Sequence, residues 1–244
     1  MRSVRESVTG SAATLRPRDF LAVNRGGGLY SEAVSQPLGS AIAYGAGRMG
    51  LSPSALTLVN LVLGVATSVS VVVLAPRMAT GAVPAWAVGL AALVAWQVAY
   101  ALDCADGQLA RATGQASAAG ARLDVLCDVA AHIALVSALV SVTYAYRPGT
   151  PAWLGAAFAG TWMVNLVTSV MQSGPNAASM VPSRTPAVRV VKLVRDPGAV
   201  FLVVGVVIAA VPQWTVVMVW AFTALNGAFL LASIVFAATG TRRS

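Results

Sequence analysis

Six apolar stretches constrain the fold of this chain more than any other feature of its sequence. They cover residues 51–74, 84–102, 120–146, 151–171, 198–211 and 214–237. A helix that crosses a bilayer needs about 20 predominantly apolar residues, so the short fifth stretch favours an earlier helix start, near Val188. The chain is 57% hydrophobic and only 10% charged, whereas soluble domains carry about 25% charged residues. The sequence therefore predicts an all-α fold, an integral membrane bundle of six transmembrane helices in one compact domain.

A further helix is expected before the first span. After the break at residues 26–28, apolar residues recur at helical spacing, namely Leu29, Ala33, Val34, Leu38, Ala41 and Ile42. This pattern predicts an amphipathic helix that lies along the membrane surface, limited or kinked by Pro37. We expect residues 1–50 to form a cytoplasmic segment with this interfacial helix, residues 51–238 the transmembrane domain, and residues 239–244 a cytoplasmic tail.

Half of the eight acidic residues of the chain fall between Asp103 and Asp128. Asp103 and Asp106 are three residues apart, and Asp124 and Asp128 are four apart, so each pair lies on one face of its own helix. An acidic side chain in an apolar helix costs about 2.5–3.5 kcal/mol to insert, so four of them need compensation. Two facing helices would present four carboxylates to one point, which suits one or two hard cations such as Mg²⁺. The alternative is a structural network with the two arginines of the stretch.

Basic residues indicate the orientation of the helices. Only Arg77 and Arg147 of the 16 lysines and arginines fall in loops opposite the chain's start. Positive residues concentrate in cytoplasmic loops, so we expect a multi-pass protein of the cell membrane with both termini and the acidic stretch inside. The net charge of +8 could indicate nucleic acid binding, but the basic residues form no face interleaved with aromatic ones, so no nucleic acid partner is expected.

The acidic stretch also carries a family resemblance. The order is Asp103, two residues, Asp106-Gly107, two residues, Ala110-Arg111, eight residues, Gly120, three residues, Asp124, three residues, Asp128. This pattern resembles the complete signature of the CDP-alcohol phosphotransferases. The segment 51–57 is similar, more weakly, to the opening of the family's first membrane helix. An inactive scaffold is disfavoured because every signature position is present.

The resemblance implies a divalent-metal-dependent transferase of phospholipid biosynthesis, which moves a phosphatidyl or other phospho-alcohol group from a CDP-linked donor to a hydroxyl acceptor and releases CMP. It implies that two Mg²⁺ or Mn²⁺ ions are held by Asp103, Asp106, Asp124 and Asp128, and that Asp128 also acts as catalytic base. It assigns the nucleotide site to Gly107, Ala110, Arg111 and Gly120. Small residues let a ring or phosphate approach the backbone, although close helix packing explains them too. Arg111 could contact phosphate or pair with an aspartate. The resemblance also implies a homodimer.

The donor and the acceptor are less constrained than the chemistry. A site at the membrane edge favours CDP-diacylglycerol, whose tails can stay in the bilayer, but a small CDP-alcohol donor with a lipid acceptor would use the same residues. Contacts to an acceptor phosphate are expected from Arg122, Arg184, Arg189, Lys192 and Arg195. Anchoring of a cytoplasmic loop to lipid head groups explains the last four equally well. Val129 stands where members that use inositol phosphate carry Arg, which disfavours that acceptor.

Other residues have more than one interpretation. Cys104 and Cys127 are expected to be small buried residues, and His132 a hydrogen-bonded core residue rather than a partner of Asp128. Polar residues within the spans line a cavity or bond across helices: Asn60, Gln97, Asn165 and Asn226. A transporter or cation channel is the alternative functional class, but the polar path and internal duplication expected of it are not evident.

Overall fold

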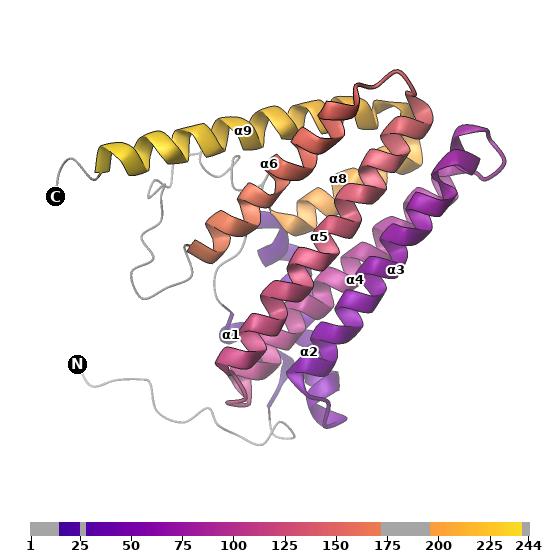
Figure 1. The fold of residues 1–244 in the computed structure, drawn as a ribbon. Coiled ribbons are helices and arrows are strands. Elements are labelled where there is room, and N and C mark those ends of the chain that lie inside the picture. The colour runs from indigo at the N-terminus through magenta and orange to yellow at the C-terminus, as the bar shows by residue number, and fades with distance from the viewer. Residues whose placement is uncertain (1–14, 25–27, 172–195, 241–244) are drawn as a thin grey trace. The chain divides into compact units, whose positions relative to one another are not determined.

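The computed structural model describes residues 15–24, 28–171 and 196–240. Within these ranges the chain forms helices and no strand, which confirms the all-α prediction for this part of the protein (Figure 1). The elements in chain order are α1 (Pro17–Ala22), a π-helical turn η2 (Ser31–Ser35), α2 (Gln36–Arg48), α3 (Pro53–Ala79), α4 (Ala85–Ala112), α5 (Ala118–Tyr146), α6 (Ala152–Met171), α8 (Pro197–Ala210), a 3₁₀ turn η3 (Pro212–Trp214) and α9 (Thr215–Gly240).

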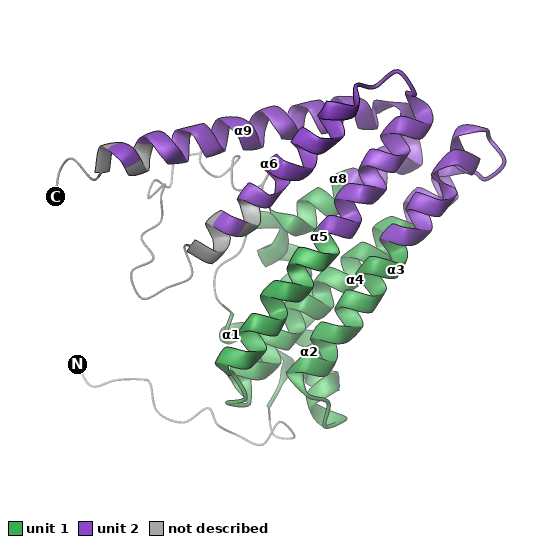
Figure 2. Ribbon diagram, viewed as in Figure 1, with its two compact units in different colours: residues 1–67, 91–132, 191–203 green, residues 68–90, 133–190, 204–244 purple. Residues whose placement is uncertain are grey.

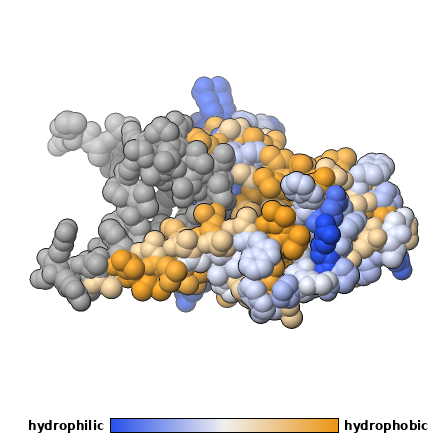
Figure 3. All heavy atoms as spheres, turned by 90° about the horizontal axis from the view of Figure 1, so that it is seen from above, coloured by the Kyte–Doolittle hydropathy of each residue, from blue (hydrophilic) through white to orange (hydrophobic). Residues whose placement is uncertain are grey.

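Four stretches of helix among the described residues are long and apolar enough to cross a membrane: Pro53–Ala79, Ala85–Ala112, Ala118–Tyr146 and Pro212–Val235. Two shorter apolar helical stretches are Ala152–Val164, within α6, and Pro197–Ala210, which is α8. Large apolar side chains remain exposed on these helices, and apolar residues, in orange, reach the surface in Figure 3. Exposed large apolar side chains on helices of this length are typical of contact with a membrane. The count of six spans stays a prediction, and an earlier start of the fifth helix lies outside the described residues.

Local capping explains where α3 begins and ends. The Ser52 hydroxyl accepts a hydrogen bond from the Ala55 amide at 3.2 Å, and Pro53 occupies the first helical position, where its missing amide costs nothing. The helix continues past the end expected at residue 74, with Pro76 inside it. The Thr80 amide still bonds the Pro76 carbonyl at 3.1 Å, so the last turn is maintained.

The connection between α4 and α5 is shorter than the sequence predicts. Gly114, with a φ of +72°, follows the last turn of α4, and the next amide, of Gln115, bonds the Ala110 carbonyl at 2.8 Å. Helix α5 begins at Ala118 rather than at Gly120. The reason is Ser117, whose hydroxyl accepts the Gly120 amide at 3.0 Å and so caps the helix two residues earlier.

Helix α2 packs through small and polar residues, of which Ala43 and Ala46 belong to an apolar core with residues of α1, α3 and α4. Its buried residues are Gln36, Gly39, Ser40, Ala43 and Ala46. A Cβ atom at Gly39 would lie 2.8 Å from the Cys104 Cβ of α4, so glycine is needed for this close approach. The apolar Leu38 is 51% exposed instead. The position of α2 along a membrane surface stays a prediction.

The chain divides into two compact units, drawn in green and purple in Figure 2. Unit 1 comprises residues 1–67, 91–132 and 191–203, and unit 2 comprises residues 68–90, 133–190 and 204–244. In unit 2, α6 packs on α9, with the rings of Trp153 and Trp220 edge to face at 5.2 Å. Unit 1 contains the whole acidic stretch.

Candidate functional site

Three carboxylates converge in unit 1. Helix α4 carries Asp103 and Asp106, and α5 carries Asp124. One carboxylate oxygen of each lies within 4.8 Å of the others. Asp106 is only 5% exposed, and the other two are half-buried. A donor set made only of carboxylate oxygens fits hard divalent cations such as Mg²⁺ and Mn²⁺.

Asp128 stands one helical turn after Asp124 on α5 and is half-buried. It does not belong to the group formed by Asp103, Asp106 and Asp124. Its carboxylate is nevertheless close enough to be repelled by the charges of these three residues. The His132 ring donates from Nδ1 to the backbone carbonyl of Asp128 at 2.7 Å. This bond uses the carbonyl and not the carboxylate, as expected of a hydrogen-bonded core histidine.

Helix α3 supplies neutral donors to two of these carboxylates. Thr57 Oγ1 donates to Asp106 Oδ2 at 2.5 Å, and Asn60 Nδ2 donates to Asp103 Oδ1 at 3.2 Å. Thr57 is 4% exposed and Asn60 7%. Such bonds orient an acidic group without cancelling its charge.

Neither donor was assigned this role from the sequence. Asn60 was expected to line a cavity or to bond across helices, and its bond from α3 to Asp103 of α4 confirms the second. Thr57 was considered only as part of the segment that opens α3. A signal was nevertheless present, because Thr57 and Asn60 have the same spacing of three residues as Asp103 and Asp106. Two polar pairs of equal spacing can meet when their helices pack side by side.

Arg111 lies in the last turn of α4, beside the carboxylates. Its Nε donates to the Val23 carbonyl at 2.9 Å, and its charge attracts Asp106 and Asp124. A Cβ atom at Gly107 would lie 2.8 Å from Arg111 Nη1. Gly107 therefore leaves room for the guanidinium against the helix backbone, and its contact with a nucleotide stays a prediction.

The remaining residues predicted for the site differ in how far they are buried. Ala110 and Gly120 are half-buried, as Gly107 and Arg111 are. Arg122 is exposed, and its Nε donates to the Ala118 carbonyl of its own helix at 3.2 Å. Four of the predicted acceptor contacts lie outside the described residues: Arg184, Arg189, Lys192 and Arg195. Both cysteines are free, with Cys104 half-buried and Cys127 buried.

A second fully buried carboxylate besides Asp106 is Asp196, which is 2% exposed and was not predicted from the sequence. It accepts hydrogen bonds from the Ser31 amide at 2.9 Å, the Ser31 hydroxyl at 2.5 Å and the Gly198 amide at 3.0 Å. The Ser31 hydroxyl also meets the Tyr100 hydroxyl at 2.9 Å. Asp196 thus caps α8 and ties the segment before α2 to it. The available signal was the order Asp, Pro, Gly, which is typical of a helix start.

Comparison with known proteins agrees with the geometry. The model of the CDP-alcohol phosphatidyltransferase family matches residues 50–239, a range that includes the acidic stretch. A search of curated proteins finds no match. The four apolar helices also fit a membrane protein. This chain therefore belongs to the CDP-alcohol phosphatidyltransferase family, whose members transfer a phosphatidyl group from a CDP-alcohol.

Proposed function

We propose that this protein transfers the phosphatidyl group of CDP-diacylglycerol to a hydroxyl acceptor and releases CMP, as a step of phospholipid biosynthesis. The observation that carries the proposal is the convergence of Asp103, Asp106 and Asp124 within 4.8 Å, in a chain of this family. These three residues would hold Mg²⁺ or Mn²⁺, and Asp128 would complete the site for a second ion. Bound ions would neutralise charge on the pyrophosphate of the donor.

The residues of the chain have separate tasks in this reaction. Thr57 and Asn60 hold Asp106 and Asp103 in place through the bonds from α3. Asp128, next to the tight group but outside it, accepts the proton of the acceptor hydroxyl. The hydroxyl oxygen forms a bond to the phosphorus of the phosphatidyl group as the bond between that phosphorus and the CMP oxygen breaks, and CMP leaves with the electron pair.

The nucleotide and the acceptor would bind next to the carboxylates. Gly107, Ala110 and Gly120 are small and half-buried, which supports a close approach of the cytidine ring or phosphate to the backbone. Arg111 adds a positive charge beside them. The acceptor phosphate, where there is one, would be bound by Arg122, Arg184, Arg189, Lys192 and Arg195.

We assign CDP-diacylglycerol as the substrate that donates the phosphatidyl group because of where the carboxylates lie along their helices. They lie in the last turns of α4 and the first turns of α5, both apolar enough to cross a membrane. A lipid donor could keep its tails in the bilayer at such a position. We infer six spans, with α6 and α8 among them, both termini and the site in the cytoplasm, and α2 along the surface. A homodimer stays a prediction from the resemblance.

The test is a release assay on the full chain in detergent. Labelled CDP-diacylglycerol is incubated with Mg²⁺ and a panel of acceptors (glycerol phosphate, inositol phosphate and serine), and both CMP and the new lipid are identified. We expect CMP release that EDTA abolishes and excess Mg²⁺ restores. Release only from a small CDP-alcohol with diacylglycerol would reverse donor and acceptor. No release from any CDP-alcohol would refute the transferase.

The role of Asp128 needs a separate comparison. Asp128→Asn removes the proton acceptor while keeping nearly the same shape, and Glu32→Gln makes the same change at an exposed carboxylate. General-base catalysis contributes about 10²–10⁴-fold, so we expect a loss of that size for Asp128→Asn and none for Glu32→Gln. Metal-dependent release that survives in Asp128→Asn would refute the assignment of the base while leaving the family unchanged.

A further inference from the structure

Helix α4 is bonded to its neighbours not only at the carboxylates but also one to two turns before them. Gln97 Nε2 donates to the Gly198 carbonyl in the first turn of α8 at 2.8 Å. The Tyr100 hydroxyl meets the Ser31 hydroxyl, in the segment before α2, at 2.9 Å. Tyr100 precedes Asp103 by one helical turn, and its hydroxyl is close enough to interact electrostatically with that carboxylate.

The bond between the two hydroxyl groups has a defined direction. Ser31 has a single hydroxyl hydrogen, which it donates to Asp196 Oδ1 at 2.5 Å. The Tyr100 hydroxyl therefore donates to Ser31. Tyr100 is connected in this way to a carboxylate that is 2% exposed and that also accepts two backbone amides. Because a buried donor without an acceptor is costly, this chain of bonds holds the Tyr100 hydroxyl in place.

The surroundings of Asp196 are closely packed. A Cβ atom at Gly28 would collide with the Asp196 carboxylate. The Tyr100 ring lies edge to face on Phe201 of α8, with 5.8 Å between the ring centroids. Closely packed groups have little room to shift, so the position of Asp196 determines the position of the Tyr100 hydroxyl.

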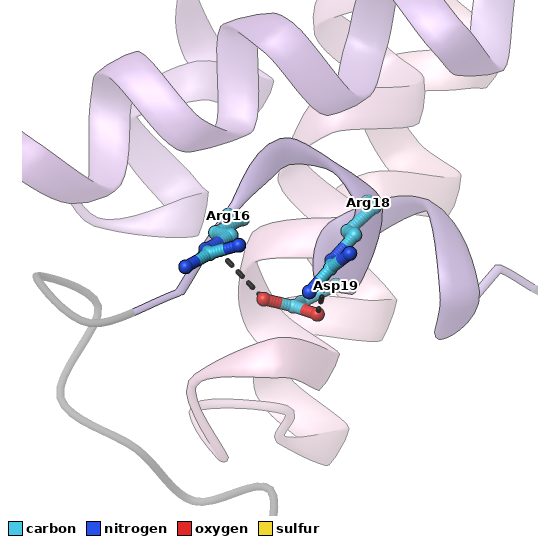
Figure 4. Close-up of polar contacts among 3 residues, drawn as sticks. All are labelled: Arg16, Arg18 and Asp19. Carbon is cyan, nitrogen blue, oxygen red and sulfur yellow. Dashed lines mark hydrogen bonds and ion pairs between the residues drawn. The ribbon is translucent and has the colours of Figure 1, made fainter.

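The segment that supplies Ser31 is itself attached to unit 1 through α1. The Asp19 carboxylate accepts a hydrogen bond from the Arg16 amide at 2.7 Å, as Figure 4 shows, and this bond caps the start of α1. Phe20 of α1 is 0% exposed and belongs to a core with residues of α3 and α4. The segment is therefore held at Phe20 as well as at Ser31, and Ser31 is a fixed partner for Tyr100.

The carboxylates of α4 and α5 repel one another. The charge of Asp103 is repelled by those of the other three aspartates of the acidic stretch, and burial strengthens such repulsion because it lowers the dielectric constant. Without an opposing force, the turn of α4 that carries Asp103 would move away from α5. A divalent ion needs its oxygen ligands at short, defined distances, so this movement would lower the affinity for metal.

We propose that Tyr100 is a positioning residue of the metal site, which holds the Asp103 turn of α4 against this repulsion. Its anchor is Asp196, and the Ser31 hydroxyl connects the two side chains. Tyr100 acts through Asp103 and is neither a metal ligand nor a substrate contact. The inference rests on the proposed function, since it takes the aspartates as ligands of a divalent cation. It assigns a role in the site to residues outside the signature.

The test measures metal binding directly in the full chain. Mn²⁺ is titrated into the protein in detergent, and free Mn²⁺ is followed by electron paramagnetic resonance. In Tyr100→Phe, which keeps the ring and loses the hydroxyl, we expect the Mn²⁺ dissociation constant to rise about fivefold, the size of effect of one lost hydrogen bond. Tyr144→Phe is the matched control, because it removes a tyrosine hydroxyl that bonds the Pro151 carbonyl in unit 2. Its Mn²⁺ dissociation constant should equal that of the unaltered protein.

A double-mutant cycle tests the connection through Ser31. Ser31→Ala removes the hydroxyl that joins Tyr100 to Asp196 and keeps the amide bond to that carboxylate. Tyr100→Phe should therefore raise the Mn²⁺ dissociation constant no further in the Ser31→Ala background. Independent, multiplicative effects of the two substitutions would overturn the proposal, because Tyr100 would then act by another route.

The number of bound ions separates positioning from general loss of structure. A partly unfolded variant binds fewer ions at saturation, whereas its folded fraction keeps the original dissociation constant. A raised constant with an unchanged number of bound ions supports positioning, and fewer bound ions at an unchanged constant would overturn it. If Tyr100→Phe does not accumulate in membranes, Ser31→Ala is judged by the same two quantities.

The outcomes also separate this inference from the transferase itself. CMP release by the unaltered protein together with a normal Mn²⁺ dissociation constant in Tyr100→Phe would overturn the role of Tyr100 and leave the transferase standing. If the unaltered protein binds Mn²⁺ but releases no CMP from any donor, the transferase fails, and the titration still decides the role of Tyr100. No binding of Mn²⁺ by the unaltered protein would overturn the inference as well.

Discussion

At the scale of residues, the carboxylate of Asp106 is the most constrained acidic group of the site. It is 5% exposed, it lies within 4.8 Å of two other carboxylates, and the Thr57 hydroxyl bonds it. A buried anion among anions is costly unless cations and hydrogen-bond donors compensate it. In the function we propose, this arrangement lowers the stability of the protein without metal and provides the carboxylates that would bind it.

Removal of the Thr57 hydroxyl is expected to weaken this site. Thr57→Val keeps the shape of the side chain but cannot donate to Asp106, and a hydrogen bond to a charged group contributes about 1.5–3 kcal/mol. We expect the Mg²⁺ concentration for half-maximal CMP release to rise about tenfold. Thr57→Ser, which keeps the hydroxyl, should remain close to the unaltered protein. Equal Mg²⁺ dependence for the valine and serine variants would contradict the role of this hydrogen bond.

Asp106→Asn is expected to move stability and activity in opposite directions. The change removes one of the mutually repelling charges, so the protein in EDTA should unfold a few degrees higher, since repulsion between close charges is strong at low dielectric constant. CMP release should fall by more than about 100-fold because a metal ligand is lost. Thermal unfolding in detergent and the release assay measure the two effects, with Glu32→Gln as control. An Asp106→Asn protein that melts lower in EDTA would argue against the repulsive cluster.

At the scale of elements, the positions of the helices depend on a few polar caps. Ser52 caps the start of α3 and Ser117 caps the start of α5, each from the loop directly before its helix. Asp196 starts α8 and at the same time bonds Ser31 in the segment before α2. This one carboxylate therefore determines both where α8 begins and where the N-terminal segment is attached.

Asp196→Ala is expected to destabilise unit 1. It leaves three donors, on Ser31 and Gly198, without their acceptor, and a buried donor left unsatisfied costs about 1–3 kcal/mol. The unfolding temperature in detergent should fall by several degrees, and limited proteolysis should cut more readily near Ser31. Glu32→Ala, which removes an exposed carboxylate next in sequence to Ser31, should leave both measurements unchanged. An Asp196→Ala protein as stable as that control would show that the three bonds contribute little.

Local patterns in the sequence account for part of this site and long-range contacts for the rest. The spacing of Asp103 and Asp106 places both on one face of α4, and the polar loop after α4 implies that α5 returns beside it. The partners Val23 and Arg111, or Ser31 and Asp196, are far apart in sequence, and no periodicity connects them. The early start of α5 was not predicted because the apolar stretch begins only at residue 120, whereas the capping hydroxyl of Ser117 lies before it.

At the scale of the whole molecule, many large apolar side chains of the described helices are exposed. Large apolar side chains stay exposed on several of the membrane-length helices, for example Val62 of α3 at 67% and Leu231 of α9 at 66%. Lipid tails are the solvent that removes such side chains from water. The four aspartates of the acidic stretch, with Arg111 and Arg122, lie where α4 ends and α5 begins.

Tryptophan fluorescence can test this exposure directly. Trp220 of α9 is 46% exposed, whereas Trp96 of α4 is 2% exposed. In variants that keep a single tryptophan, lipids brominated on their acyl chains should quench Trp220 at least about twofold more strongly than Trp96, because quenching requires close contact. Equal quenching of the two would contradict a lipid-facing α9.

The bond between the Val23 carbonyl and Arg111 has a practical consequence. A recombinant fragment that starts at residue 50, where the family match begins, would retain every signature residue and all four membrane-length helices. It would nevertheless lack the Val23 carbonyl oxygen, which accepts the hydrogen bond from Nε of the signature arginine. Such a fragment would also lose the bonds from Ser31 to Asp196, so it should be less stable and need more cytidine nucleotide to saturate. An assay run at one low substrate concentration would then take it for an inactive enzyme.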